Sequence, residues 1–216
     1  MAEAQTPTVT LSLDGQLYRG WTAVSIRRGL DSVNGDFELT LTTRERTGGQ
    51  AWPLRAGAAC AIAADGETLI TGWIDRLSAQ ISGDNHVISV SGRDKAADLV
   101  DCSAVAKPGI WINAALATIV QDLVAPFGIT ASIEGDTGAK IRRFALQTGE
   151  TVWSAIERLL RFRGLIAWSQ SDGTLKIGSP AKGGVIARLA EGLNILEASA
   201  DHDVSERVGE YIVCGQ

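Results

Sequence analysis

Short segments in which apolar and polar residues alternate dominate the first part of the chain and constrain its fold more than any other feature. In residues 9–13, valine and leucine alternate with threonine and serine, a period of two that buries one face of a strand. Strand-like composition recurs in segments 21–26, 37–42, 59–63, 69–77 and 87–90. Turn residues such as Asp14-Gly15 and Asp65-Gly66 separate these segments. About six short strands at this spacing predict a small β-barrel or sandwich, and we place a first β-barrel domain at residues 1–100.

Beyond Gly92 the spacing of apolar residues changes from a period of two to that of a helix. The residues that share the helical spacing are Ile112, Ala115, Leu116, Ile119, Val120 and Leu123. Pro126 and Gly128 end this run. Residues 129–133 are then suited to a short strand.

A second helix and a hairpin are expected next. Thr148 is placed to cap the helix, an apolar stripe begins at Val152, and Gly164 supplies the residue type that commonly ends helices. The two short apolar segments on either side of Asp172-Gly173 are typical of a β-hairpin. We therefore predict a compact α/β module of two helices and a hairpin over residues 101–182.

The C-terminal segment contains a faint repeat of the first domain. Residues 180–184 have the proline and glycine content of a linker. Strand-like segments follow at 185–189, 195–196 and 210–215. Gly35-Asp36-Phe37 and Gly209-Glu210-Tyr211 align at an offset of 174 residues, and each follows a strand-like pair and a polar loop. The expected fold class is α+β and rich in strands: a small β-barrel, an α/β module, and the beginning of a second, related β-barrel at residues 183–216.

Charge and cysteine content exclude several classes of protein. The chain carries 20 basic and 25 acidic residues, a net charge of −5, which argues against a dedicated nucleic-acid binder because phosphate contacts need a basic surface. Three cysteines without a CxxC pair form a poor disulfide framework and favour a reducing compartment. The polar start at residues 1–7 lacks the apolar stretch of a signal peptide, and the longest apolar runs, 56–64 and 109–120, are far short of the ~20 residues that span a bilayer. We expect a soluble protein made in a cytoplasm, with no membrane partner.

Motifs for catalysis and metal binding are missing from the sequence. It contains no GxSxG, HExxH, GxxxxGK[ST] or helix-opening GxGxxG. Asp201-His202-Asp203 is the one cluster that resembles metal ligands, and without a second histidine nearby we interpret it as a solvated loop. Cys102 is interpreted as a small buried residue, and the doublets Arg27-Arg28 and Arg142-Arg143 as salt-bridged surface. The expectation is a protein that is not an enzyme and has no cofactor or metal.

One segment supports an alternative function. Gly149-Glu150-Thr151 and the helix after it resemble the opening of a LysM module, a small peptidoglycan-binding unit. That reading makes the protein a peptidoglycan-binding or wall-degrading component. A LysM module also needs a second helix, whereas Asp172-Gly173 predicts a hairpin there.

The most distinctive segment is residues 90–104, which links the first domain to the module. We single out eight of its residues as a structural motif: Gly92, Arg93, Asp94, Lys95, Asp98, Leu99, Asp101 and Cys102. From the residues alone, the chain is expected to leave its strand at Gly92 and to place the charged side chains around a short helical turn, with surface ion pairs that contribute little.

As a string, this motif resembles the baseplate hub proteins of Mu-like contractile-tailed phages, also called tail protein D-like or late-control proteins. Further matches run in order along nearly the whole chain: Pro126 to Ile129, the Gly149-Glu150-Thr151 helix with Ile156-Glu157-Arg158, the Asp172-Gly173 hairpin, Glu191 to Ile195, Asp203 to Arg207, Tyr211 and Gly215-Gln216.

The resemblance implies a structural protein of the virion tail baseplate, encoded by a phage or prophage and assembled in the host cytoplasm. Members of the family have two related β-barrels per chain and form homotrimers that join the sixfold tail tube to the threefold spike. The implied partners are further copies of itself, the spike, tube and baseplate wedge proteins, and DNA only by passage through the lumen. Acidic residues lining that lumen would repel DNA. Family members continue beyond the Tyr211 strand to complete the second barrel, so at Gln216 we expect an incomplete one.

Overall fold

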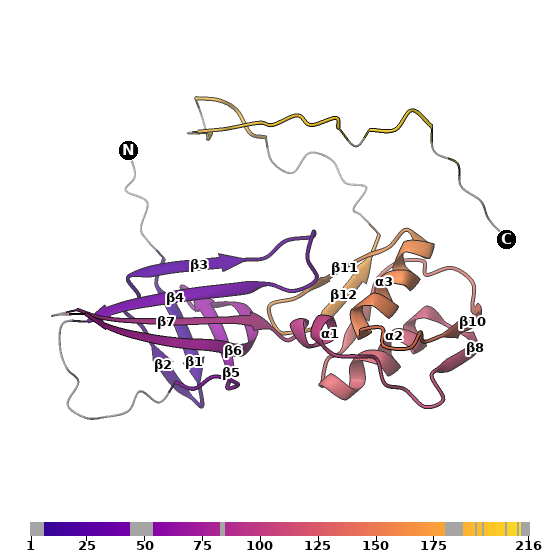
Figure 1. Ribbon diagram of the computed structural model, residues 1–216, viewed down its shortest axis with the longest axis horizontal. Coiled ribbons are helices and arrows are strands. Elements are labelled where there is room, and N and C mark those ends of the chain that lie inside the picture. Colours follow the sequence, from indigo (N-terminus) through magenta and orange to yellow (C-terminus); the bar gives the residue numbers. More distant parts are fainter. Residues whose placement is uncertain are drawn as a thin grey trace. The chain divides into compact units, whose positions relative to one another are not determined.

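The computed structural model describes residues 7–43, 54–82, 85–179, 188–192, 194–195, 197–205, 207–210 and 212. The chain divides into two compact units, Met1–Pro180 and Ala181–Gln216. The first unit contains all the named helices and strands, in one curved sheet followed by a helical module (Figure 1). The α+β, strand-rich class predicted from the sequence is confirmed.

Seven antiparallel strands form the N-terminal sheet. They are β1 (Val9–Leu13), β2 (Gln16–Tyr18), β3 (Ala23–Arg27), β4 (Asp36–Thr43), β5 (Ala59–Ala64), β6 (Glu67–Ser82) and β7 (Asn85–Asp94). Their order across the sheet is β2-β1-β5-β6-β7-β4-β3, so β2 and β3 are its edges within the described part of the chain. The six segments predicted as strands all lie in this sheet, and only the three-residue β2 was not predicted.

The sheet curls around a single apolar core. Leu11 of β1, Ile62 of β5 and Ile74 of β6 belong to one buried cluster. Phe37 of β4 belongs to it too, although β7 lies between β4 and β6 in the order of the sheet. Shifts in strand register, one of them after Ile74, accompany this curvature, since such irregularities increase local twist. Because apolar and polar residues alternate along the strands, the apolar face of the curled sheet encloses a barrel-like interior.

The helical module follows β7. Its elements are α1 (Ala97–Asp101), β8 (Ile110–Ala114), α2 (Leu116–Val124), the 3-10 helix η1 (Ala125–Phe127), β9 (Ala131–Ile133), β10 (Ile141–Ala145), α3 (Val152–Arg163), β11 (Ile166–Ser169) and β12 (Leu175–Gly178). β8 pairs with β10, and β11, β12 and β9 form a three-stranded sheet. The predicted hairpin is confirmed, because β11 and β12 pair antiparallel. A core separate from that of the curved sheet lies between α2, α3 and the three-stranded sheet.

Two boundaries of the predicted helices are wrong. The first helix starts at Leu116, and Ile112 instead lies in β8 with 74% of its surface exposed. The apolar residues of β8 happened to continue the helical spacing into the strand. The second helix is capped by Thr151 rather than Thr148, because the Thr151 hydroxyl accepts a hydrogen bond from the Ser154 amide. Its end at Gly164 is as predicted, with φ of 61°.

The predicted strands of the C-terminal segment lie largely outside the described residues, including 185–187, 196, 211 and 213–216. Among the described residues beyond 187 there is one isolated bridge, between Glu191 and Ile195, and no strand. The domain boundaries and the second barrel therefore stay predictions.

Gly92 tests how tightly the curved sheet is packed. It lies opposite Phe37 on β4 and Ile74 on β6, and a Cβ at Gly92 would overlap the Trp73 carbonyl and approach the Phe37 ring to 2.6 Å. Because overpacking forces backbone shifts, we expect Gly92→Ala to lower the free energy of unfolding by about 1–3 kcal/mol in urea denaturation. Gly209→Ala, where a Cβ meets nothing within 4 Å, is the matched control. Equal stability of the two variants would contradict this packing.

Candidate functional site

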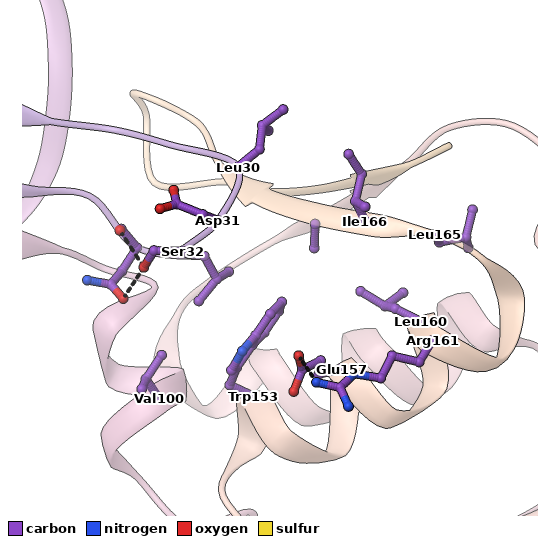
Figure 2. Close-up of a pocket in the computed structure, with 13 residues that line it drawn as sticks. Leu30, Asp31, Ser32, Val100, Trp153, Glu157, Leu160, Arg161, Leu165 and Ile166 are labelled. Atoms are coloured by element: carbon purple, nitrogen blue, oxygen red, sulfur yellow. Dashed lines mark hydrogen bonds and ion pairs between the residues drawn. The ribbon is translucent and has the colours of Figure 1, made fainter. Parts of the chain in front are cut away.

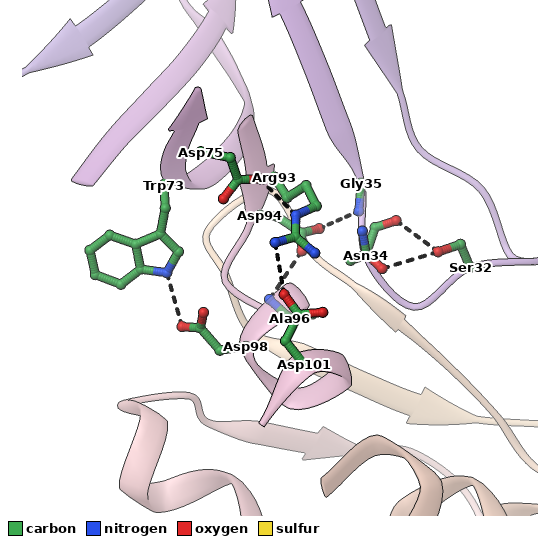
Figure 3. A network of polar contacts seen from close by, with 10 residues as sticks. All are labelled: Ser32, Asn34, Gly35, Trp73, Asp75, Arg93, Asp94, Ala96, Asp98 and Asp101. Atoms are coloured by element: carbon green, nitrogen blue, oxygen red, sulfur yellow. Dashed lines mark hydrogen bonds and ion pairs between the residues drawn. The ribbon is translucent and has the colours of Figure 1, made fainter. Parts of the chain in front are cut away.

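The motif at residues 92–102 carries the chain from the curved sheet into the helical module. β7 continues through Arg93 to Asp94, so the prediction that the strand ends at Gly92 is wrong. The extension occurs because the strand keeps pairing, with Arg93 opposite Trp73 on β6 and Asp36 on β4. Figure 3 shows the polar contacts that gather where this strand meets α1.

Asp94 is the buried centre of the junction, with 1% of its surface exposed. Its carboxylate accepts hydrogen bonds from the Gly35 amide at 2.7 Å and the Ala96 amide at 3.0 Å, and Figure 3 shows it lying between the two. Its own amide donates to the Gly35 carbonyl at 3.1 Å. Burial raises the pKa of Asp94, and its hydrogen bonds and the positive charge of Arg28 oppose this rise. One carboxylate thus joins the β3–β4 loop to the start of α1.

Arg93 and Asp98 make a second, more exposed set of contacts at the same place. The Arg93 guanidinium donates to Asp75 of β6 at 2.7 Å and to Asp101 of α1 at 2.8 Å. The indole N–H of Trp73 donates to Asp98 at 3.0 Å. Each exposed ion pair contributes little stability. Together, however, the charged side chains fix α1 against β6, which is the arrangement around a short helical turn that the sequence predicts.

Contacts from the β11–β12 hairpin complete the junction. Arg28 donates to the Ser169 carbonyl at 2.9 Å, and the Ser169 amide donates to the Val33 carbonyl at 3.1 Å. The Thr71 hydroxyl donates to the Ser171 carbonyl at 2.7 Å. Val33, from the β3–β4 loop, is itself buried in the core of the helical module. The sheet and the module therefore share backbone hydrogen bonds and a core residue.

The other motif residues have separate roles. Leu99 is fully buried in the module core. The Lys95 amide donates to the Thr71 carbonyl, and its side chain lies close against Gly173 in the hairpin turn. Cys102 is exposed, which corrects the prediction of a buried residue: α1 ends just before it and the chain continues extended at the surface. Its carbonyl accepts a hydrogen bond from the Val152 amide at the start of α3.

A groove of about 360 Å³ lies beside the junction, between the β3–β4 loop and α3. Figure 2 shows Leu30 and Trp153 at its sides, with Glu157 and Arg161 along the helix. Glu157 and Arg161 are paired with each other at 2.7 Å. Among the described residues, its lining combines apolar side chains such as Val33, Val100 and Leu160 with the polar residues of the β3–β4 loop.

No group of three or more potential metal ligands occurs among the described residues. Asp201, His202 and Asp203 are exposed, and the Asp203 carboxylate accepts a hydrogen bond from the Ser205 amide, which lowers the pKa of Asp203. None of the helices in the described part of the chain combines the length and apolar character needed to cross a bilayer.

The prediction that the two arginine doublets form salt bridges is wrong for the described residues, where none of the four arginines has an ion pair. Arg28 uses the Ser169 carbonyl instead of an ion pair, and within the described residues Arg142 and Arg143 have no ion-pair partner. Sequence reasoning also missed the junction partners Gly35 and Ser169. Gly35 was noted only as part of the internal repeat, and a lone serine in a hairpin carries no signal of its own.

Two family models match consecutive parts of the chain. Residues 8–94 match the N-terminal domain of Mu phage baseplate assembly protein GpP-like proteins, and residues 96–179 match the second domain of gp44-like baseplate hub proteins. The boundary between the matches falls at residue 95, inside the motif and directly after the buried Asp94.

Individual proteins show the same similarity. The chain is 38% identical to baseplate hub protein gp44 of Escherichia phage Mu over 211 residues, 96% of this chain and 55% of that protein. It resembles the 43 kDa tail protein of prophage MuSo2 from Shewanella oneidensis (TM-score 0.87, 32% identity, 93% of this chain and 62% of that one). A tail protein from Neisseria meningitidis MC58 shares the fold (TM-score 0.78, 24% identity, 93% and 61%). The chain thus spans about three fifths of the length of these relatives.

Asp94→Asn tests the buried centre of the junction. An amide has one acceptor oxygen, so one of the two backbone N–H groups of Gly35 and Ala96 loses its partner. We expect the free energy of unfolding at pH 7 to fall by about 1–3 kcal/mol in urea denaturation. Asp31→Asn, at an exposed position of the same loop, is the control and should leave stability unchanged. An Asp94→Asn variant with the same free energy of unfolding as the wild type would contradict the assigned hydrogen bonds.

The difference in stability between the wild type and Asp94→Asn should depend on pH in a defined direction. Because the pKa of Asp94 is raised above the ordinary 3.8, the folded state binds this proton at higher pH than the unfolded state. In the pH range between the pKa of Asp94 in the unfolded state and its higher pKa in the folded state, the contribution of Asp94 to stability grows as pH falls and is lost as pH rises. The stability difference between wild type and Asp94→Asn should therefore widen between pH 7 and 4. A difference that narrows would have the wrong sign.

Alkylation with iodoacetamide at pH 8 should distinguish two cysteines by their reactivity. Cys102 is exposed, whereas burial raises the pKa of the Cys60 thiol to about 12 and removes its reactive thiolate. Peptide mass spectrometry should find Cys102 modified in the folded protein and Cys60 only after unfolding in urea. Modification of both at the same rate in the folded protein would show that Cys60 is not enclosed by the curved sheet.

Proposed function

The chain belongs to the family of Mu-like baseplate hub proteins, and from this we propose that it serves as a structural hub in the baseplate of a contractile phage or prophage tail. The observation that carries the proposal is the 38% identity to the hub of phage Mu over 96% of this chain. Because the chain spans only 55% of that relative, the role of the whole hub comes to this chain as a proposal.

The geometry of the junction supports a structural role. A hub has to hold its parts in fixed positions while other tail components bind to it. Here the sheet and the module are joined by a buried, hydrogen-bonded carboxylate and by Val33 in the module core. Buried polar networks whose members are satisfied specify one arrangement of the elements they connect. We propose that the motif around Asp94 exists to fix this arrangement.

The proposed assembly follows the family. The hub forms a homotrimer, with two related barrels per complete chain, and joins the sixfold tail tube to the threefold spike. Spike, tube and baseplate wedge proteins are its partners, and DNA passes through the lumen. The place of the protein is the virion baseplate after assembly in the host cytoplasm. Acidic residues along the lumen, drawn from a chain of net charge −5, would keep DNA from adhering.

A non-enzymatic role is part of the proposal. Both perturbed buried groups, Asp94 and Cys60, lie in structural surroundings: the junction and the core of the curved sheet. The comparisons give no support to the alternative of a peptidoglycan-binding or wall-degrading component. The helix after Gly149-Glu150-Thr151 is followed by the β11–β12 hairpin, whereas a LysM module needs a second helix.

Purified tails test the proposal directly. Tails from the phage or induced prophage that encodes the chain should contain it, and gold-labelled antibodies raised against the chain should bind at the end of the tail that carries the spike. Quantitative mass spectrometry should give about three copies per tail. Labelling along the sheath, or tails that lack the protein, would contradict the hub assignment.

A further inference from the structure

A second groove, on the side of the helical module formed by β10 and the C-terminal half of α3, is strongly basic. Its volume is about 480 Å³, and five cations line it: Lys140, Arg142, Arg143, Arg158 and Arg163. Among the described residues, the rest of the lining is apolar and contains no carboxylate. We propose that this basic groove is a docking site for an acidic segment of a partner protein that also carries an apolar side chain.

The cations of the groove differ in how far they are already engaged. Arg158 pairs with Glu150 at 2.9 Å and lies over the Phe144 ring at 4.4 Å, and Arg163 donates to the Ala139 carbonyl. Lys140, Arg142 and Arg143 are exposed, and their side chains have no hydrogen-bond or ion-pair partner within the described residues.

Unpaired cations gathered in one place attract a negatively charged ligand. Five of the 20 basic residues line this one groove in a chain of net charge −5. Like charges held close together repel, and an anionic ligand removes that repulsion. The ligand that complements the groove is therefore acidic.

The apolar part of the groove selects the class of partner. Phe162 has 91% of its surface exposed at the rim, and Ile141, Phe144 and Leu159 provide apolar lining. A large exposed aromatic beside arginines is the combination enriched at the energetic centres of protein interfaces. An apolar side chain of the partner would cover Phe162, while its carboxylates bind Arg142 and Arg143.

These observations favour a protein segment over nucleic acid. Single-stranded nucleic acid needs a continuous basic track with several aromatic platforms, whereas among the described residues of this lining Phe162 is the one exposed aromatic. The inference names a partner class for the proposed hub, but it stands on the groove itself and is tested on the isolated chain.

The test is fluorescence anisotropy of the full chain with a labelled short peptide that alternates glutamate and leucine. The control probes are the same peptide with lysine for glutamate, the same peptide with serine for leucine, and duplex DNA of random sequence. We expect the glutamate–leucine peptide to bind, with an affinity that falls as salt is raised, and both peptide controls to bind about tenfold more weakly or not at all.

Variants assign the binding to the groove. Arg142→Glu with Arg143→Glu should weaken peptide binding about tenfold or more, and Phe162→Ser should weaken it several-fold without affecting folding, because Phe162 is exposed. Arg19→Glu with Arg76→Glu makes the same change in net charge at exposed positions of the curved sheet and should leave binding unchanged. Circular dichroism checks that each variant is folded.

Three results would overturn the inference. They are absence of peptide binding up to millimolar concentration, binding that the sheet variant weakens as much as the groove variant does, and tighter binding of DNA than of the peptide through Arg142 and Arg143. Each of them leaves the proposed hub role untouched, since that role is tested on assembled tails.

Discussion

One buried carboxylate determines how the two parts of the first unit are joined. Asp94 ends the last strand of the curved sheet and accepts hydrogen bonds from the β3–β4 loop and from the turn that begins α1. A charge this deeply buried is costly unless its lone pairs are satisfied. Because the two amide donors belong to different elements, satisfying the carboxylate places the sheet, the loop and the helix relative to one another. The ion pairs of Arg93 and the contact of Trp73 with Asp98 surround this centre without replacing it.

Local pattern was sufficient to predict much of the fold. Alternation identified six of the seven strands of the curved sheet, and glycine and aspartate positions identified the β11–β12 hairpin and the end of α3. The predictions from local pattern were wrong where a residue fits two structural roles equally well. Ile112 continues a helical spacing but lies in a strand, and Thr148 has the same capping chemistry as Thr151. β10 was not recognised as a strand because its apolar residues, Ile141, Phe144 and Ala145, do not alternate with its two adjacent arginines.

The candidate site was predicted in part. The motif at residues 92–102 was found as a string, and the structure shows why its charged residues are close together in sequence: they flank the point where sheet becomes module. Its partners Gly35 and Ser169 could not be found in that way. Gly35 lies 59 residues before Asp94, and Ser169 lies in the hairpin after α3. Contacts between distant segments leave no local signature. The unpaired arginines of the basic groove were missed for the same reason, since a doublet in sequence does not reveal whether carboxylates lie nearby.

These features agree with the proposed structural role. The buried Asp94 carboxylate orders the backbone around it, burial raises the pKa of the Cys60 thiol, and the surface offers grooves for contact. Native-state hydrogen exchange followed by NMR tests the central claim that the junction is part of the rigid core. The amides of Gly35 and Ala96 should exchange only on global unfolding, as slowly as those of Leu39 and Val90 in the sheet. Exchange at the rate of exposed loops would show that the two parts open independently, and would contradict the account.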